Sequence, residues 1–158
     1  GIRVVNVYVP NGQAVGTEKF LYKLEWLNHL KIMLDNDLKE YPKMVVLGDF
    51  NIAPSDEDIH DPDEWKDKIL CSDQERSALE EILSLGFHDS FRLFEKGSGF
   101  HSWWDYRAAA YRRGLGLRID LLLASDELKS ACKKGYIDEK PRGLEKPSDH
   151  TPVVIEIS

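Results

Sequence analysis

The chain has 158 residues, of which 42% are hydrophobic and 31% charged, and a formal net charge of −7. This length suits one globular domain, 1–158, no apolar run approaches a membrane span, and the acidic balance excludes indiscriminate binding to nucleic acid. The two cysteines, Cys71 and Cys132, are too few for a disulfide framework, and we expect no secretory leader. We therefore expect a cytoplasmic protein with no membrane partner.

Apolar patterning predicts two strands and a helix at the start of the chain. The β-branched run 2–9 breaks at Pro10-Asn11-Gly12, which is typical of a buried strand followed by a turn. Apolar residues then recur every three or four positions, which predicts an amphipathic helix from the N-cap Thr17 to just before Pro42. Residues 44–47 predict a second, short strand.

A long loop is predicted over 52–71, and loops of this length in compact domains are usually functional or mobile. Its stretch 56–67 holds seven acidic residues and Lys66 alone, so we expect a solvated surface there. Ser72 and Glu75 form a capping-box pattern that predicts the start of a second helix.

The second half of the chain is predicted to be mostly strands, with a short helix near 127–132. The predicted strands are 91–94, 100–104, 117–124 and 151–157. They follow one another without room for crossover helices, so antiparallel pairing must be common. We predict an α/β (α+β) sandwich of mixed, largely antiparallel sheets flanked by helices.

Three short polar clusters each lie at the end of a predicted strand. They are Gly48-Asp49-Phe50-Asn51, Arg118-Ile119-Asp120 and Ser148-Asp149-His150. Because strand ends present side chains to solvent, we expect three carboxylates, a carboxamide and an imidazole to converge in one polar pocket. That set suits metal-assisted attack of water on a phosphate ester. Taken alone, Asp49 after its glycine turn is better explained as a cap of a turn or helix, and Ser148-Asp149-His150 as a plain turn before the last strand.

Relationships within the clusters suggest how the side chains pair. Asp49 and Asn51 would point the same way in an extended segment and could address one water or one phosphate oxygen. Asp120 interrupts an apolar run and needs a partner, because a buried unpaired carboxylate is costly. His150 is the natural candidate, which would leave Asp149 free to bind a hard cation.

A basic stretch, 107–118, holds four arginines and no acidic residue, and it follows Trp103, Trp104 and Tyr106. The combination of cations and aromatic rings could hold a polyanion such as DNA. A strand and hairpin with ordinary exposed arginines is an equally good interpretation.

Five segments occur in a specific order along the chain. They are Val7–Gly12, Leu47–Asn51, Ser102–Arg107, Leu117–Ser125 and Lys146–His150. In this order and spacing they resemble the exonuclease-endonuclease-phosphatase superfamily, most closely its exonuclease III type of abasic-site repair nucleases. The resemblance spans essentially the whole chain, and it implies a partial four-layer α/β sandwich that performs metal-dependent phosphodiester hydrolysis in DNA repair.

The resemblance implies catalytic roles for five residues. Asp49 would orient or deprotonate the attacking water, and Asn51 would hold its geometry and touch the phosphate. His150, paired with Asp120, would stabilise negative charge on a non-bridging oxygen. Tyr8 would contact the phosphate or assist the leaving group.

Metal and DNA contacts follow from the same resemblance. Asp149, with Asp49 and Asn51, would bind Mg²⁺ or Mn²⁺. The residues implied for binding double-stranded DNA with abasic sites or 3′ ends are Asn11 at the backbone, Trp103 and Leu117 as pocket walls, and Arg112 and Arg113 in a loop that presses on the duplex.

Relative to the family, we expect about the N-terminal third to be absent, with a glutamate that is the family's principal metal ligand. The resemblance therefore predicts weak metal binding, doubtful activity of this chain alone, and association with the missing segment or with a second copy. Two alternatives stay open. One is a superfamily phosphodiesterase or phosphatase that acts on RNA, on lipid head groups or on small phosphates such as inositol phosphates. The other is a non-catalytic binding or assembly module.

Overall fold

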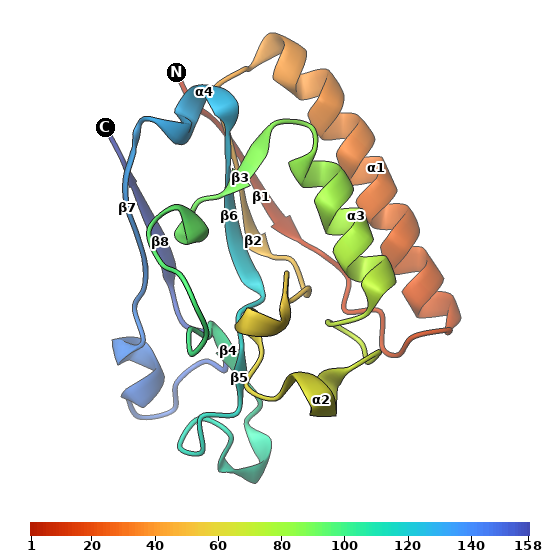
Figure 1. Cartoon of the computed structure of the whole chain (residues 1–158), viewed down its shortest axis with the longest axis vertical. Helices are drawn as coiled ribbons and strands as arrows, with labels where there is room; N and C mark the ends of the chain where they lie inside the picture. The colour runs from red at the N-terminus through yellow and green to blue at the C-terminus, as the bar shows by residue number, and fades with distance from the viewer.

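A computed structural model describes residues 1–158, and its strands and helices form three layers (Figure 1). Helices α1 (Glu18–Glu40) and α3 (Asp73–Leu83) cover one face of a four-stranded sheet. That sheet has the order β1 (Arg3–Tyr8), β2 (Met44–Asp49), β6 (Asp120–Ser125) and β3 (Phe87–Asp89). A two-stranded sheet of β7 (Cys132–Ile137) and β8 (Val153–Ile157) lies on its other side.

The remaining elements are short. They are the strand pair β4 (Trp103–Trp104) and β5 (Gly116–Leu117), the helices α2 (Pro62–Trp65) and α4 (Asp126–Lys129), and 3₁₀ turns at Asp56–Asp58, Phe91–Leu93, Arg107–Ala109 and Lys140–Gly143. β1 runs parallel to β2, and every other strand pair is antiparallel. The predicted class, a mixed and largely antiparallel α/β fold flanked by helices, is therefore confirmed. None of the helices combines the length and apolar character needed to cross a membrane.

The alternation of side chains along β2 builds a core on both faces of the sheet. Val46 points toward the helices, where it packs with Leu27 and Leu34 of α1 and Ile82 of α3. Its neighbour Val45 points the other way and packs in a second cluster with residues of β6, α4 and β7. Burial on both faces explains why β2 reads as a continuous apolar run.

The structure corrects two predicted strands in the second half. Residues 91–94 form a 3₁₀ turn, and the strand lies earlier, at β3, where Phe87 pairs with Ser125 of β6. The predicted strand 117–124 is two strands, because the Arg118 N–H bonds to the Asp58 carbonyl oxygen instead of continuing a ladder. Sequence patterning missed β7, whose Lys133 and Lys134 interrupt its apolar residues.

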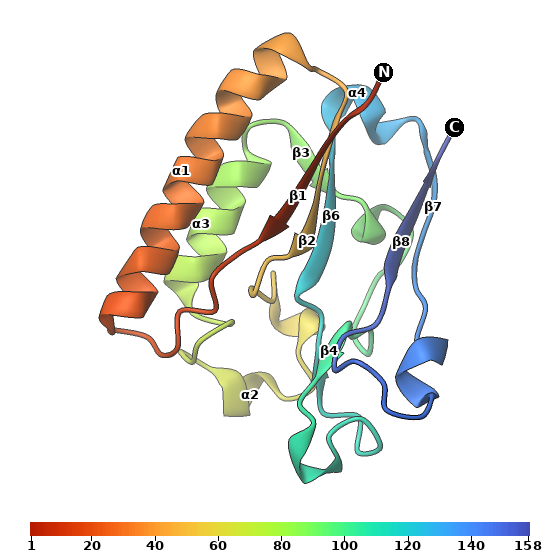
Figure 2. The ribbon, with the colours of Figure 1, turned by 180° about the vertical axis from the view of Figure 1, so that it is seen from behind.

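Strand register places three site residues in one row across the sheet. Tyr8 lies opposite Asp49, and Asp49 lies opposite Asp120, so all three share one face at the same end of the sheet. Gly48 permits this register, because a Cβ there would overlap the Val7 carbonyl oxygen. Both chain termini lie at the opposite end, beside α4 (Figure 2).

Candidate active site

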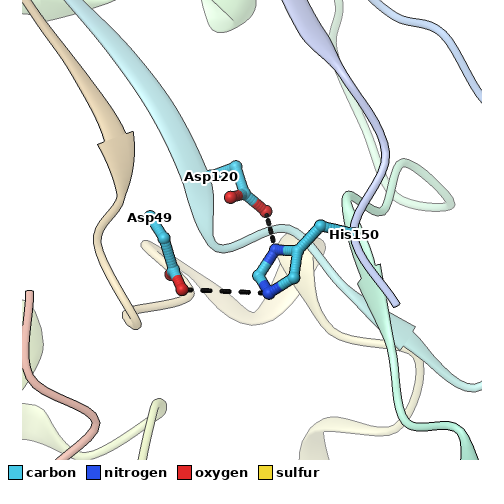
Figure 3. A group of neighbouring side chains, drawn as sticks. All are labelled: Asp49, Asp120 and His150. Carbon is cyan, nitrogen blue, oxygen red and sulfur yellow. Dashed lines mark hydrogen bonds and ion pairs between the residues drawn. The ribbon is translucent and has the colours of Figure 1, made fainter. Parts of the chain in front are cut away.

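The structure brings Asp49, Asp120 and His150 together at the end of this row (Figure 3). The His150 Nδ1 lies 2.8 Å from Asp120 Oδ2, and its Nε2 lies 3.8 Å from Asp49 Oδ2. The two aspartates come from β2 and β6, whereas His150 comes from the segment before β8. The imidazole therefore bridges two carboxylates from different strands, with all three side chains partly exposed to solvent.

A residue that the sequence analysis gave no role, Ser102, lies behind this cluster. Its side chain is fully buried, and its hydroxyl donates to Asp120 Oδ2 at 2.7 Å. The same hydroxyl oxygen accepts the N–H groups of Ile119 and Asp120, each at 3.0 Å. Asp120 is thus oriented by Ser102 on one side and His150 on the other. The only sequence signal was its place at the start of the Ser102–Arg107 motif.

Asn51 contacts Asp49 through a turn and not through an extended segment, so the predicted geometry is wrong here. Its φ of 49° is left-handed, a conformation that asparagine tolerates better than most residues. The Asn51 backbone N–H donates to Asp49 Oδ1 at 2.8 Å, and its Nδ2 lies 3.2 Å from Asp49 Oδ2 and 2.9 Å from the Val9 carbonyl oxygen. Asp49 is held in place by these two donors.

Burial and neighbouring charges shift both key pKa values. Burial, with the nearby charge of Asp120, raises the pKa of Asp49 to about 6, although Asn51, His150 and Lys23 act in the opposite direction. Burial alone would lower the pKa of His150, but the hydrogen bond and charge of Asp120 outweigh it and raise that pKa above its usual 6.5. Asp49 is still mostly a carboxylate near neutral pH, because its pKa of about 6 lies below 7. The raised pKa of His150 favours an imidazolium beside it.

The cluster opens into a cavity of about 370 Å³. The predicted site residues that line it are Tyr8, Asn11, Asp49, Asn51, Trp103, Asp149 and His150. The structure adds Trp65 and Ile69 from the long loop, together with Arg107 and Ile119. A substrate in the cavity would therefore meet polar groups from the strand ends and an apolar wall.

Three lining residues have contacts that bear on their expected roles. The Tyr8 side chain is at the mouth, where the residue is 72% exposed. The Asn11 Nδ2 lies 3.4 Å from Asn51 Oδ1, so the two carboxamides touch. Asp149 Oδ2 accepts the Trp103 indole N–H at 3.0 Å, and Asp149 is not part of the three-residue group that could hold a metal.

Two expectations about the walls and the basic stretch need correction. Leu117 is fully buried in a cluster with Ile59 and Ile119, so it underlies the cavity and does not line it. Arg118 is fully buried, with Asp58 at 2.7 Å and Asp89 at 2.6 Å, and it is not available to a polyanion. The sequence could not reveal this, because its acidic partners lie 60 and 29 positions away.

The same pairing shows that the acidic loop is not wholly solvated, since Asp58 is 1% exposed. The remaining arginines of the basic stretch are on the surface. Arg112 and Arg113 are exposed and lie outside the cavity lining, whereas Arg107 lines it and is paired with Asp105 at 2.7 Å.

The donor atoms of Asp49, Asp120 and His150 all lie within 4.8 Å of one another. Two carboxylates and an imidazole fit a divalent cation, and the oxygen donors are those that Mg²⁺ and Mn²⁺ prefer. The hydrogen bond between His150 and Asp120 competes with metal binding by both groups. Asp49 is thus the member of the group best placed to bind a cation.

The protein is an α/β sandwich in which a mixed sheet lies between two helices and a second sheet. An acid–histidine centre lies where the strands of the mixed sheet end. Residues 4–150 match the model of the Endonuclease/Exonuclease/phosphatase family. The chain belongs to that family, and the resemblance inferred from the five motifs is confirmed.

Two bacterial exodeoxyribonucleases align with nearly the whole of this chain and are longer than it. It is 36% identical over 157 residues to an exodeoxyribonuclease of Bacillus subtilis, an alignment that covers 98% of this chain and 60% of the relative. It is 35% identical over 163 residues to exodeoxyribonuclease III of Haemophilus influenzae, covering 98% and 61%. The chain thus spans about 60% of the length of these curated relatives.

Two solved structures share the fold over nearly the whole chain. A Neisseria 3′ phosphatase bound to a product DNA hairpin is 44% identical with a TM-score of 0.97, covering 100% of this chain and 62% of that one. An AP endonuclease from Archaeoglobus fulgidus is 40% identical with a TM-score of 0.92, covering 98% and 60%.

Proposed function

We propose that this chain carries the reaction centre of a metal-dependent phosphoesterase that acts on DNA at abasic sites or 3′ ends. The observation that carries the proposal is the contact of His150 with Asp120 and Asp49 at the edge of the cavity. The named relatives, which are exodeoxyribonucleases, a 3′ phosphatase and an AP endonuclease, support DNA as the substrate.

In the proposed reaction, a water molecule attacks phosphorus while Asp49 accepts its proton. The bond from phosphorus to the leaving oxygen breaks, the leaving oxygen takes up a proton from solvent to become a hydroxyl, and the product phosphate keeps the oxygen of the water. His150, held by Asp120, donates to a non-bridging oxygen and stabilises the negative charge that grows there. A bound Mg²⁺ or Mn²⁺, held by Asp49 with Asn51 and Asp149 nearby, would neutralise charge on the phosphoryl and leaving oxygens.

Residues around the cavity would hold the rest of the DNA. Asn11 and Asn51, whose carboxamides touch, would contact the phosphate, with Tyr8 near the leaving oxygen. Trp103 forms part of the apolar wall that would accept an extruded sugar without a base, for which unstacking costs least. Arg112 and Arg113 are exposed and would contact the duplex outside the cavity.

We further infer that residues 1–158 form part of a single domain, and that catalysis needs a protein segment or a second copy in addition. β1 is an edge strand, so it can accept another strand, and the side chains of Ile2, just before it, and Val4, within it, are left 45% and 58% exposed. An added carboxylate would also strengthen the cation site, because the Asp120 carboxylate is already hydrogen-bonded to His150.

The test is cleavage of a duplex with one abasic site, and of one with a 3′ phosphate. Each is incubated in Mg²⁺ or in a chelator, with the chain alone and with the segment of the Neisseria protein that has no counterpart here. We expect cleavage that depends on Mg²⁺ and is strongest in the mixture. A folded mixture that binds the duplex without cleaving it would instead favour a non-catalytic binding module.

The two pKa shifts predict a bell-shaped dependence of the cleavage rate on pH. The rate should rise as Asp49 loses its proton through about pH 6, and it should fall again at higher pH as His150 becomes neutral. Asp120→Asn removes the charge that raises the pKa of His150, so the falling limb should move to lower pH. Rates measured from pH 5 to 9 check this, and an unchanged falling limb in the variant would contradict it.

A further inference from the structure

A buried lysine lies beneath the cavity without being part of its lining. Lys23 on α1 is fully buried, and so is Glu75 on α3. The Lys23 Nζ lies 2.5 Å from Glu75 Oε1, 2.6 Å from the Asn51 carbonyl oxygen and 3.1 Å from the Asn11 carbonyl oxygen. An ammonium group has three N–H donors, so this one is fully used.

Glu75 is equally well satisfied. Its Oε1 also accepts the Leu70 N–H at 3.0 Å, and its Oε2 accepts the N–H and the hydroxyl of Ser72 at 3.1 and 2.6 Å. The Lys23–Glu75 pair therefore connects two helices with the end of the long loop, and it leaves no charge unpartnered.

Lys23 also joins two turns of the candidate site that lie 40 positions apart in the sequence. Asn11 follows β1 and Asn51 follows β2. The backbone carbonyl oxygen of each accepts a hydrogen bond from the Lys23 ammonium group. The methylene chain of Lys23 packs under the first turn, where a Cβ on Gly12 would lie 3.0 Å from Lys23 Cδ. The second turn contains the left-handed Asn51, whose backbone carbonyl oxygen accepts a hydrogen bond from Lys23 at 2.6 Å.

Stability alone does not account for this arrangement. Taking two charges out of water offsets much of their attraction, and uncharged residues of similar volume are often as stable. An uncharged side chain at position 23 would fill the same space. It would not donate to both carbonyl oxygens, which belong to the turns that carry the Asn11 and Asn51 carboxamides.

We propose that Lys23 is a positioning residue, whose buried ammonium group locks the turns of Asn11 and Asn51 together so that both carboxamides face the cavity. Its effect on catalysis rests on the proposed phosphoesterase function, whereas the lock between the two turns can be measured without any reaction. Lys23 itself does not touch the substrate.

The test is a double variant, Lys23→Met with Glu75→Gln, which removes both buried charges while keeping the volume. The matched control is Lys31→Met with Glu81→Gln, because that pair also joins α1 to α3, at 2.5 Å, but is solvent-exposed. In the Lys23 variant, the Asn51 amide protons should exchange with solvent about tenfold faster, while the α1 and α3 amides stay as slow as in the control. DNA cleavage should fall on the order of ten- to a hundredfold.

Wild-type exchange at Asn51 in a stable double variant would overturn the proposal. If the double variant does not fold, Glu75→Gln alone decides, because it keeps Lys23 and both carbonyl contacts. Slow Asn51 exchange in that variant supports the lock, whereas fast exchange, or unfolding of this variant too, assigns the pair to stability and overturns it. Absence of cleavage by the wild-type protein would refute the proposed function and leave the exchange result to decide the lock.

Discussion

Asp49→Asn is expected to reduce the rate of DNA cleavage by roughly 10²–10⁴-fold, because asparagine cannot accept a proton from the attacking water. The substitution is nearly isosteric, and the carboxamide oxygen can still accept the Asn51 backbone N–H, so the turn should survive. Binding of the duplex should change much less than the rate. Single-turnover cleavage with saturating protein measures this, and turnover near that of the wild type would remove Asp49 from the mechanism.

The same substitution should stabilise the folded chain at neutral pH in the absence of metal. The folded-state pKa of Asp49, about 6, lies above its usual value, so the stability that this group contributes is complete at low pH and is lost as pH rises through about 6. Asparagine does not ionise and avoids this loss. The variant should therefore unfold at higher urea concentration than the wild type at pH 8, and the difference should shrink toward pH 4. Equal midpoints at both pH values would contradict the origin of the shift.

Arg118→Met is expected to destabilise the fold by roughly 3–5 kcal/mol, because it leaves the carboxylate of Asp89 without its partner and that of Asp58 with Arg92 alone. Arg118 lies between Asp58 and Asp89, and both carboxylates are largely buried. Burial alone would raise the pKa of Asp58, but the charges and hydrogen bonds of Arg118 and Arg92 outweigh it and lower that pKa. A lowered pKa contributes stability at neutral pH that is lost on acidification. The cost of the variant should therefore be greatest near pH 7 and smaller below pH 4.

Urea unfolding at these two pH values measures the effect, with Arg112→Met as the matched control. Arg112 is exposed, so its replacement should change stability by less than about 0.5 kcal/mol while weakening DNA binding. A second variant, Arg118→Met with Asp89→Asn, should recover part of the lost stability by removing one of the stranded charges. If Arg118→Met and Arg112→Met were equally stable, the buried network would not support the fold.

Sequence patterning predicted the parts of the fold where local and tertiary preferences agree. The helix that starts after Thr17 shows this, because its N-cap hydroxyl accepts the Phe20 N–H and its apolar side chains meet the sheet. The capping box of Ser72 and Glu75 likewise marks the start of α3. The same signal hid a second role of Glu75, since nothing local shows that its carboxylate also meets Lys23 from α1.

Convergence of the candidate site could be predicted because its residues come in clusters at strand ends. The orientation of each side chain could not, because it depends on contacts between distant segments. Ser102 meets Asp120 across 18 positions, and Lys23 meets Asn51 across 28. The prediction was wrong at Arg118. A run of arginines indicated an exposed basic surface, but Arg118 is buried and paired with Asp58 and Asp89. Composition along the chain does not distinguish these outcomes.

The most direct test of the account is the fate of solvent oxygen in cleavage at an abasic site. The reaction is run in ¹⁸O-labelled water with Mg²⁺, using this chain together with the added Neisseria segment, and the products are weighed by mass spectrometry. Attack by water held at Asp49 predicts one ¹⁸O in the terminal phosphate and an intact 3′ hydroxyl on the other strand end. A product with an unsaturated sugar fragment and no ¹⁸O would show elimination, and it would contradict hydrolysis at this centre.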